Sequence, residues 1–280
     1  MSYYFILRGM VFLSVGLLLY GWKHRNAKGH KITMLGWFLF GVYWLLMVPH
    51  YLAVGEVVNA AYCLLGFPLF LFLIYHESLS IVLDDEPPTL SFMAGTTGIA
   101  AGMYFLIDTF PPIEAGFVWL TAVETAGLLT LFGYEAHAGG VHYGDVVRVP
   151  IYHYANNGIS IILACTAIQS IVIFIAAILC TNADRMRKWK AFFYTVPVIL
   201  ILNVVRTAAV VYLVYEGIAD FNLAHNYLSR WGSMLVLVVL AFFMFDILPE
   251  LHENIMGIPM LIKRKNPYRI LKAHGGRESH

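Results

Sequence analysis

Long apolar segments with few charged residues recur along the chain, and they constrain its fold more than any other feature. Of the 280 residues, 60% are hydrophobic and only 12% are charged, whereas soluble domains carry roughly a quarter charged residues. A soluble core of this size cannot enclose so much apolar surface. The solvent around most of the chain is therefore expected to be lipid.

Eight of these segments have the length and composition of membrane spans, since a helix needs about 20 mostly apolar residues to cross a bilayer. A transmembrane barrel would instead show short segments of alternating polarity. The sequence thus predicts an all-α, polytopic transmembrane helical bundle of about eight spans, with a membrane domain at residues 1–250 and a basic cytoplasmic tail at 251–280. The expected spans are 3–20, 32–47, 57–75, 89–107, 115–132, 159–181, 191–215 and 227–248.

Basic residues in the links bear on the topology, because cytoplasmic loops are enriched in lysine and arginine. The link before the seventh span and the tail both read as cytoplasmic, which puts both termini inside in an eight-span scheme. The link at 23–31 is also basic, yet this scheme places it outside, so either the span count is off by one or this loop breaks the rule. The basic residues are Lys23, Arg25, Lys28 and Lys31 in the first link, Arg185, Arg187, Lys188 and Lys190 in the second, and Lys263, Arg264, Lys265, Arg269 and Lys272 in the tail.

Several function classes find no support in the sequence. The net charge of +1 gives no basic field of the kind that binds nucleic acid. Cys63, Cys165 and Cys180 each lie in an apolar stretch and form neither a disulfide framework nor a metal-binding pattern. No nucleic-acid partner and no cofactor are therefore predicted.

The longest link, at 133–158, carries three histidines. The spacing of His137, His142 and His153 matches no strong metal-ligand pattern, so no metal site is predicted there. Long connections in compact proteins are often functional. We expect this link to act as a lid over a site or as a dock for a peptide.

Ionisable residues inside a membrane are costly and therefore informative. Arg206 lies well within the seventh segment, and Asn203 precedes it on the same helical face. A snorkelling or structural arginine is the alternative. Cys165 lies near the outer end of the sixth segment, with Gln169 four residues later on the same expected helical face.

A lone cysteine in an apolar helix is usually a small packing residue. An arginine at similar depth in the next segment favours the reactive thiolate, which is the nucleophilic form of cysteine. His225 and Arg230 flank the start of the eighth segment, where His225 suits acid–base chemistry and Arg230 suits an oxyanion or a carboxylate. Both are also ordinary residues for a membrane interface.

Glu124 is an acid deep in the fifth segment. It is expected either to pair with Arg206 or to help bind a substrate, and a purely structural ion pair is about as plausible.

The order of these features is similar to that of the exosortase/archaeosortase superfamily: a cysteine in one span, Asn-x-x-Arg in the next, and a histidine-bearing segment before the last. The stretch Ala-Cys-Thr-Ala-Ile-Gln-Ser at 164–170 looks most like the archaeosortase A family. The resemblance covers residues 159–248 well, which would be the catalytic part, whereas the first five spans match only in character.

The resemblance implies a membrane-embedded cysteine transpeptidase or protease. Such enzymes recognise a C-terminal sorting signal on secreted or surface proteins, of the Pro-Gly-Phe type in archaeosortase A, and join the new C-terminus to a membrane lipid. By resemblance, Cys165 would be the nucleophile that carries the thioacyl intermediate and Arg206 its essential partner. The third group would be His225, because exosortases generally have a histidine there, or Arg230, because an arginine is important in some archaeosortases.

Supporting roles would fall to Asn203, Gln169 and Glu124, and the site would lie near the extracellular face of a multi-pass protein of the cell membrane. A rival hypothesis is a polytopic transporter or lipid-binding protein with Arg206 and Glu124 in a midplane site. Transporters often show paired repeats, but here the two halves do not match. A purely structural assembly protein would leave Arg206 without a role.

Overall fold

The computed structural model describes residues 2–153 and 158–264, apart from the side chains of residues 2–5 and 226. Of the basic tail, Lys265, Arg269 and Lys272 lie outside these ranges. The chain forms two compact units, one of residues 1–102 with 252–280 and one of residues 103–251. The long helices are α1 (Ser2–Lys23), α2 (Ala27–Ala53), α3 (Val57–Leu83), α4 (Pro88–Thr109), α5 (Pro111–Leu131), α7 (Arg185–Tyr215) and α8 (Arg230–Ile247).

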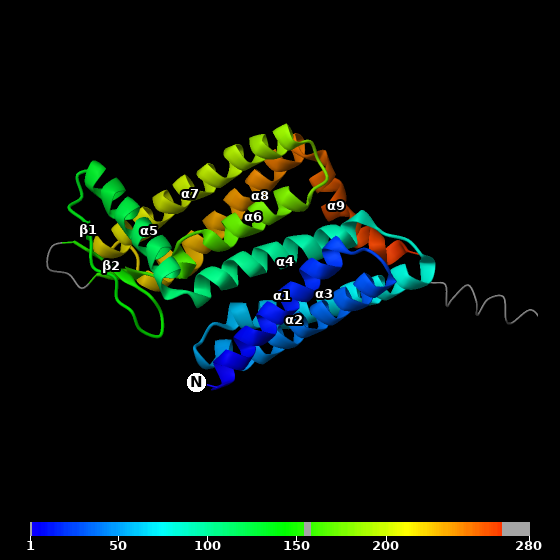
Figure 1. The fold of residues 1–280 in the computed structure, drawn as a ribbon. Helices are drawn as coiled ribbons and strands as arrows, with labels where there is room; N and C mark the ends of the chain where they lie inside the picture. Colours follow the sequence, from blue (N-terminus) through cyan, green and yellow to red (C-terminus); the bar gives the residue numbers. More distant parts are fainter. Residues whose placement is uncertain (1, 154–157, 265–280) are drawn as a thin grey trace, which may run out of the picture. The chain divides into compact units, whose positions relative to one another are not determined.

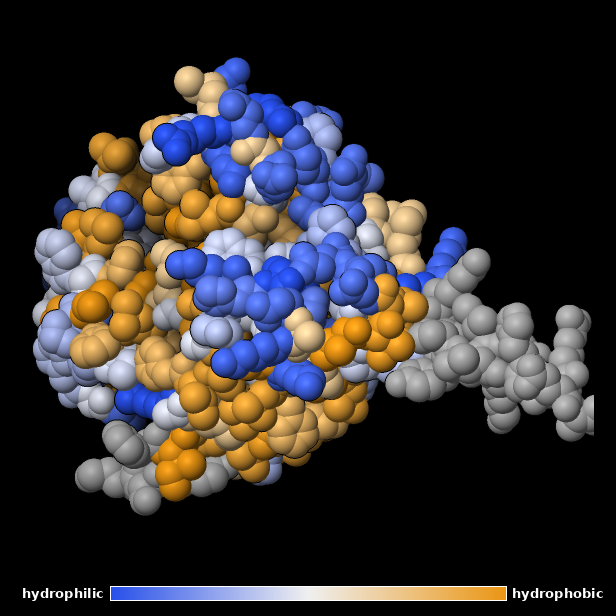
Figure 2. Space-filling view, turned by 45° about the vertical axis from the view of Figure 1, so that its right-hand side comes forward, coloured by the Kyte–Doolittle hydropathy of each residue, from blue (hydrophilic) through white to orange (hydrophobic). Residues whose placement is uncertain are grey.

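These helices confirm the predicted all-α membrane bundle. In the described ranges, 7 helices are long and apolar enough to cross a membrane, the last of them running from Asn222 to Ile247. Large apolar side chains face outward, such as Leu65 at 71% and Leu235 at 67% exposed. Figure 2 shows broad hydrophobic surface interrupted by patches of hydrophilic residues. So much exposed apolar area is typical of a protein surrounded by lipid.

In the first unit, α1, α2 and α3 lie side by side (Figure 1) and are tied together by a buried carboxylate. Glu77 on α3 is fully buried and accepts hydrogen bonds from Arg25 at 3.2 and 3.3 Å, and it lies 2.5 Å from Nδ1 of His30. A buried charge is tolerated only with such partners. The first basic link is therefore fixed against the C-terminal part of α3.

The start of the predicted tail is ordered. Helix α9 (Pro249–Met260) and the short helix η3 (Leu261–Lys263) precede Arg264. Arg264 donates to the carbonyl oxygen of His76 and to Ser80, and it pairs with Asp85. This segment therefore ends against the C-terminal end of α3.

In the second unit, α6 (Ile168–Cys180), α7 and α8 run side by side (Figure 1). Helix α7 begins earlier than predicted because Asp184 caps it and accepts a hydrogen bond from the backbone of Met186. At that end Arg187 donates two hydrogen bonds to Glu250, at 2.6 and 3.0 Å. These bonds lower the pKa of Glu250, so the pair stays charged at neutral pH.

The opposite end of this unit carries a small antiparallel sheet formed partly by the long link. Its strands are β1 (His137–Ala138), β2 (Val149–Tyr152) and β3 (Ile159–Ile161), in the order β1-β2-β3. Val149 pairs with Ile161 and Ile151 with Ile159. Helix α5 packs against all three strands and against α7.

The prediction of one continuous helix at 159–181 is wrong. Its first residues form β3, because the alternating Ile-Ser-Ile sequence pairs with β2. A short 3-10 helix, η1 (Leu163–Cys165), follows. Ala167 then adopts φ 59° and ψ 0°, a left-handed conformation that separates this turn from α6. What remains is a helix of 13 residues.

The left-handed conformation of Ala167 generates a stability prediction. Ala167→Gly should raise the free energy of unfolding by about 0.5–1 kcal/mol, because glycine adopts positive φ without steric cost. Ala177→Gly, inside α6, should lower it by a similar amount through helix propensity. Equilibrium unfolding in detergent measures both, and a loss of stability in both variants would contradict the assignment.

Candidate active site

Cys165 lies in a tight turn directly before α6 rather than on a membrane helix. Its backbone N–H donates to the carbonyl oxygen of Ile162 at 2.8 Å, and Thr166 Oγ1 donates to the carbonyl oxygen of Leu163 at 2.7 Å. The residue is buried, at 7% exposed. The cysteine thus lies just before the N-terminus of α6, which begins at Ile168.

Helix α7 holds this turn through two side chains that bind one backbone atom. Asn203 Nδ2 donates to the carbonyl oxygen of Cys165 at 2.9 Å, and Arg206 Nη2 donates to the same oxygen at 3.4 Å. Asn203 is itself buried on α7. The Asn-x-x-Arg pattern thus serves first to fix the backbone of the cysteine turn.

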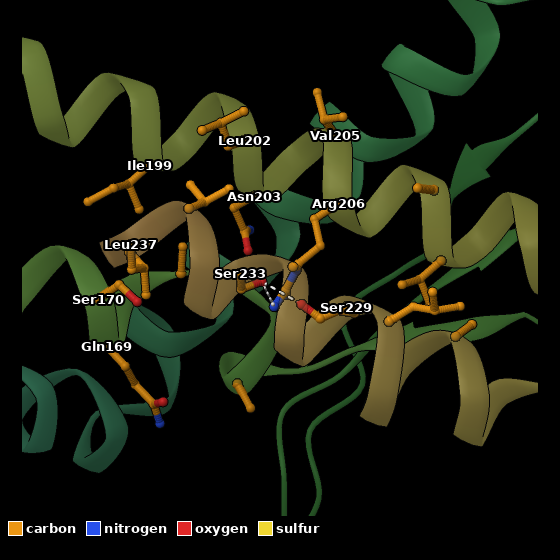
Figure 3. Close-up of a pocket in the computed structure, with 18 of the residues that line it drawn as sticks. Gln169, Ser170, Ile199, Leu202, Asn203, Val205, Arg206, Ser229, Ser233 and Leu237 are labelled. Carbon is orange, nitrogen blue, oxygen red and sulfur yellow. Dashed lines mark hydrogen bonds between the residues drawn. The ribbon is translucent and has the colours of Figure 1, made fainter. Parts of the chain in front are cut away.

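Arg206 also reaches across to α8 (Figure 3). Its Nη1 lies 3.5 Å from Ser233 Oγ, and Ser233 donates to the carbonyl oxygen of Ser229 at 2.7 Å. Its Nε is buried without a hydrogen-bond partner among the described residues. Glu124 is exposed on α5, and within the described ranges no hydrogen bond or ion pair joins it to Arg206. The expected pairing of Glu124 with Arg206 is therefore absent from the described part of the chain.

His225 lies on η2 (Asn222–Ser229), a π-helix that leads into α8, and its ring stacks on Phe221 with a centroid distance of 5.0 Å. π-Helical turns are rare and occur frequently at functional sites. A pocket of about 70 Å³ is lined by Cys165, Arg206 and His225, together with β3. Three segments far apart in the sequence thus contribute to one small space.

The other predicted residues occupy different places. Arg230 is exposed at the start of α8 and lines neither this pocket nor the larger one described below. Gln169 does not share a helical face with Cys165, since the helix begins after the cysteine. Its side chain donates to Tyr104 Oη at 3.1 Å and borders the larger cavity. The supporting roles expected of Gln169 and Glu124 stay predictions.

A cavity of about 430 Å³ lies between α6, α7 and α8. Figure 3 shows Arg206 extending from α7 toward Ser229 and Ser233 on the opposite wall. Arg206, Val210 and Ser229 line both this cavity and the small pocket, so they form the boundary between the two spaces.

Sequence reasoning missed the residue that anchors the sheet over this region. Tyr215 Oη accepts a hydrogen bond from the N–H of Ile159 at 2.6 Å and donates to the carbonyl oxygen of Ile151 at 2.5 Å. His153 lies between the rings of Tyr215 and Tyr134, with centroid distances of 6.0 and 3.8 Å. The aromatic residues on both sides of the long link were the available signal.

Tyr134 belongs to the same aromatic group and stays neutral at physiological pH. Burial and the nearby Glu216 carboxylate raise the pKa of Tyr134 to about 12. The histidines of the link are engaged separately: His153 in this stack, His137 in β1, and His142 in a bridge to Arg148. Within the described residues no group of three or more histidine, cysteine or acidic side chains is placed to hold a metal ion.

The family model of the transmembrane exosortase (Exosortase_EpsH) matches residues 4–245. The chain belongs to this family. Archaeosortase A from Haloferax volcanii is 25% identical over 194 residues, which cover 64% of this chain and 61% of that protein. No solved structure matches the chain.

The match confirms the superfamily expected from the sequence, and it extends over the first five spans, where the residues gave only a general likeness. It also agrees with a multi-pass membrane protein. This exosortase-family chain aligns with only about three-fifths of the length of its archaeal relative.

The role of Tyr215 can be tested without altering the site itself. Tyr215→Phe should speed amide hydrogen exchange at Ile159 by roughly 5- to 30-fold, because a lost buried hydrogen bond costs ~1–2 kcal/mol. Tyr212→Phe on the same helix is the matched control and should leave this amide unchanged. Equal exchange rates at Ile159 in the two variants would show that the hydroxyl does not anchor β3.

Proposed function

We propose that this protein is a membrane-embedded cysteine transpeptidase that cleaves a C-terminal sorting signal from surface proteins. The observation that carries the proposal is the small pocket lined by Cys165, Arg206 and His225 in a chain of the exosortase family. A nucleophile, a fixed cation and an acid–base group are the parts that acyl transfer needs. The signal is of the Pro-Gly-Phe type, and the new C-terminus passes to a membrane lipid.

The reaction begins when His225 accepts the proton of the Cys165 thiol and the sulfur attacks the scissile carbonyl carbon. Arg206 stabilises the negative charge that develops on the carbonyl oxygen. His225 then returns the proton to the leaving amine, the C–N bond breaks, and a thioester on Cys165 remains. A nucleophilic lipid head group gives its proton to His225 and attacks the thioester, which releases the sulfur.

The position of the third group favours His225 over Arg230. His225 shares the pocket with Cys165, whereas Arg230 is exposed and does not border it. Arg206 is already bound to the backbone of Cys165, so a small change in its side-chain torsions suffices to reach a carbonyl oxygen beside the sulfur. The turn and the arginine are therefore preorganised, which is where electrostatic catalysis gains most.

We further infer the membrane topology from the partners of the basic segments. Arg25 binds Glu77, and Arg264 binds Ser80, so both basic segments lie at the same end of α3. Arg187 binds Glu250, so α7 starts beside the end of α8. Helix α9 carries Glu250, His252 and Glu253 within 12 residues, and a segment so rich in ionisable groups does not cross the hydrocarbon core. The three basic clusters thus share one side, the cytoplasmic one.

Helix α5 then makes no crossing. Helix α4 carries the chain away from the basic side, and Tyr134, just after α5, packs on Tyr212 near the outer end of α7. Helix α5 also packs along the sheet and η1. Seven crossings result, by α1 to α4 and α6 to α8, with the N-terminus outside. This scheme removes the conflict over residues 23–31 and places the site on the outer side.

The proposed chemistry makes Cys165 indispensable. Cys165→Ala should lower turnover of a peptide bearing Pro-Gly-Phe, an apolar span and a basic end by ~10³-fold or more. Cys63→Ser and Cys180→Ser should stay close to the unchanged enzyme. Mass spectrometry of the full chain in lipid would detect the released fragment and the thioester. Normal processing by Cys165→Ala would sink the proposal and favour the transporter hypothesis.

The third group is tested in the same assay. His225→Asn should lower turnover by ~10²- to 10⁴-fold, the usual contribution of a general acid–base group. Arg230→Gln should lower it less than tenfold. The reverse order of the two losses would assign the role to Arg230 instead.

The topology predicts which loops an external reagent reaches. In a variant with all three cysteines replaced by serine, Glu56→Cys and Val146→Cys should react with a membrane-impermeant maleimide on intact cells. Lys28→Cys should react only after lysis. The eight-span scheme predicts the opposite result for Lys28 and Glu56, so the pair decides between the two.

A further inference from the structure

The larger cavity runs along α7 and has dimensions that restrict what it can hold. It extends from Leu213 to Ile199, 14 residues apart on α7, which corresponds to a length of ~21 Å. A volume of about 430 Å³ over that length gives a mean cross-section of ~20 Å² for the centres of water-sized spheres, or ~50 Å² out to the walls. A helix, 10–12 Å across with its side chains, needs roughly 80 Å² or more. A hydrocarbon chain, with carbon contacts at 3.5–4.0 Å, needs about 20 Å².

The cavity is also open to a ligand from the side. Two of its lining residues, Val205 at 48% and Leu228 at 56%, are largely exposed. Gly232 on α8 lines it as well, and a Cβ added at Gly232 would meet no atom within 4 Å. Arg206 lies midway along this length, so ~10 Å of the cavity extends from it to Ile199, and the rest of a chain bound there passes through the open side into the bilayer. A lipid in the bilayer can therefore slide one chain into this space.

The charge of the cavity points to an anionic head group. Arg206 lines it, and its described hydrogen-bond partners, Ser233 and the carbonyl oxygen of Cys165, are both neutral. Its buried Nε has no partner among the described residues. Among the described residues that line the cavity, none is an aspartate or a glutamate. A permanent cation in a low-dielectric site without a counter-charge attracts an anion, and arginine suits phosphate in particular.

We propose that this cavity binds one hydrocarbon chain of a membrane lipid whose phosphate lies at Arg206, and that this lipid is the acceptor. The inference rests on the proposed function, since it assigns a binding site to the second substrate of that reaction, the acceptor lipid. Arg206 and Ser229 border both spaces, so a head group bound at Arg206 lies next to the pocket of Cys165. Its hydroxyl or amine attacks the thioester, the C–S bond breaks, and its proton passes through His225 to the departing sulfur.

Binding can be measured without any peptide substrate. The full chain is placed in phosphatidylcholine nanodiscs with a trace of phosphatidylglycerol that carries a photoreactive diazirine in one chain. Cross-links should concentrate on residues 199–213 and 228–237. Gly232→Leu should reduce them at least fivefold by filling the cavity. Gly16→Leu is the matched control, because Gly16 is an exposed helical glycine that also has open space around it, and it should label normally.

The head-group preference is tested with a photoreactive phosphatidylcholine of the same chain. The phosphatidylglycerol label should exceed it, and Arg206→Gln should make the two equal. Cross-links spread evenly over α1 to α8, or unchanged in Gly232→Leu, would overturn the lipid site. The same holds if a photoreactive substrate span cross-links to this cavity in place of the lipid.

The acceptor role needs a second readout. In a reaction with the peptide substrate, Gly232→Leu should lower the lipid-bearing fraction of cleaved product about tenfold relative to Gly16→Leu, with water-released product in its place. An unchanged fraction, despite reduced labelling, would refute the acceptor role. If Cys165→Ala still processes substrate while the lipid label persists, the lipid site stands and the proposed enzymatic function fails. Failure of the proposed function is therefore distinguishable from failure of the lipid site.

Discussion

A guanidinium held inside an apolar helix bundle needs partners, and the arrangement of the second unit follows from how Arg206 finds them. A charged group in a membrane is costly unless it is hydrogen-bonded. Arg206 binds the carbonyl oxygen of Cys165 on one side and Ser233 of α8 on the other, with Asn203 on the same carbonyl. That carbonyl is available because the chain turns at η1 instead of continuing as a helix. The turn at Cys165 thus supplies a hydrogen-bond acceptor that offsets the free-energy cost of burying the Arg206 charge.

The turn also explains why the site lies at the end of a short helix beneath a sheet. Ala167 separates η1 from α6, and β3 leads into η1 from the sheet that Tyr215 anchors to α7. The 13 residues of α6 span only ~20 Å, about 10 Å less than the hydrocarbon core. Under the proposed topology Cys165 is therefore recessed in the membrane, with the sheet and α5 toward the outer aqueous side. In the proposed reaction, this recessed position of Cys165 protects the thioester from hydrolysis until an acceptor arrives.

Two spaces meet at Arg206, and their sizes differ in a way that fits a reaction with two substrates. The small pocket contains the nucleophile and the histidine, while the larger cavity is lined mainly by apolar and small residues. In the proposed reaction Arg206 serves both spaces, first for the developing oxyanion and then for the phosphate of the acceptor. The π-helical segment η2 contributes His225 to the first space and Ala224 to the second.

The sequence alone determined the membrane bundle, because charge-poor apolar segments of spanning length have no other stable state in a bilayer. It also marked Cys165, Arg206 and Asn203 as candidates, with His225 and Arg230 as alternatives for the third group, since polar groups inside a membrane are costly. Tertiary structure decided what periodicity and hydropathy cannot show. The isoleucines before Cys165 suit a strand and a buried helix equally well, and only pairing with β2 selects the strand. Likewise, Glu124 and Arg206 lie at comparable depths in the sequence scheme, but the packing of α5 against the sheet leaves Glu124 exposed and apart from Arg206. Side-chain contacts between distant segments depend on packing, which no single segment encodes.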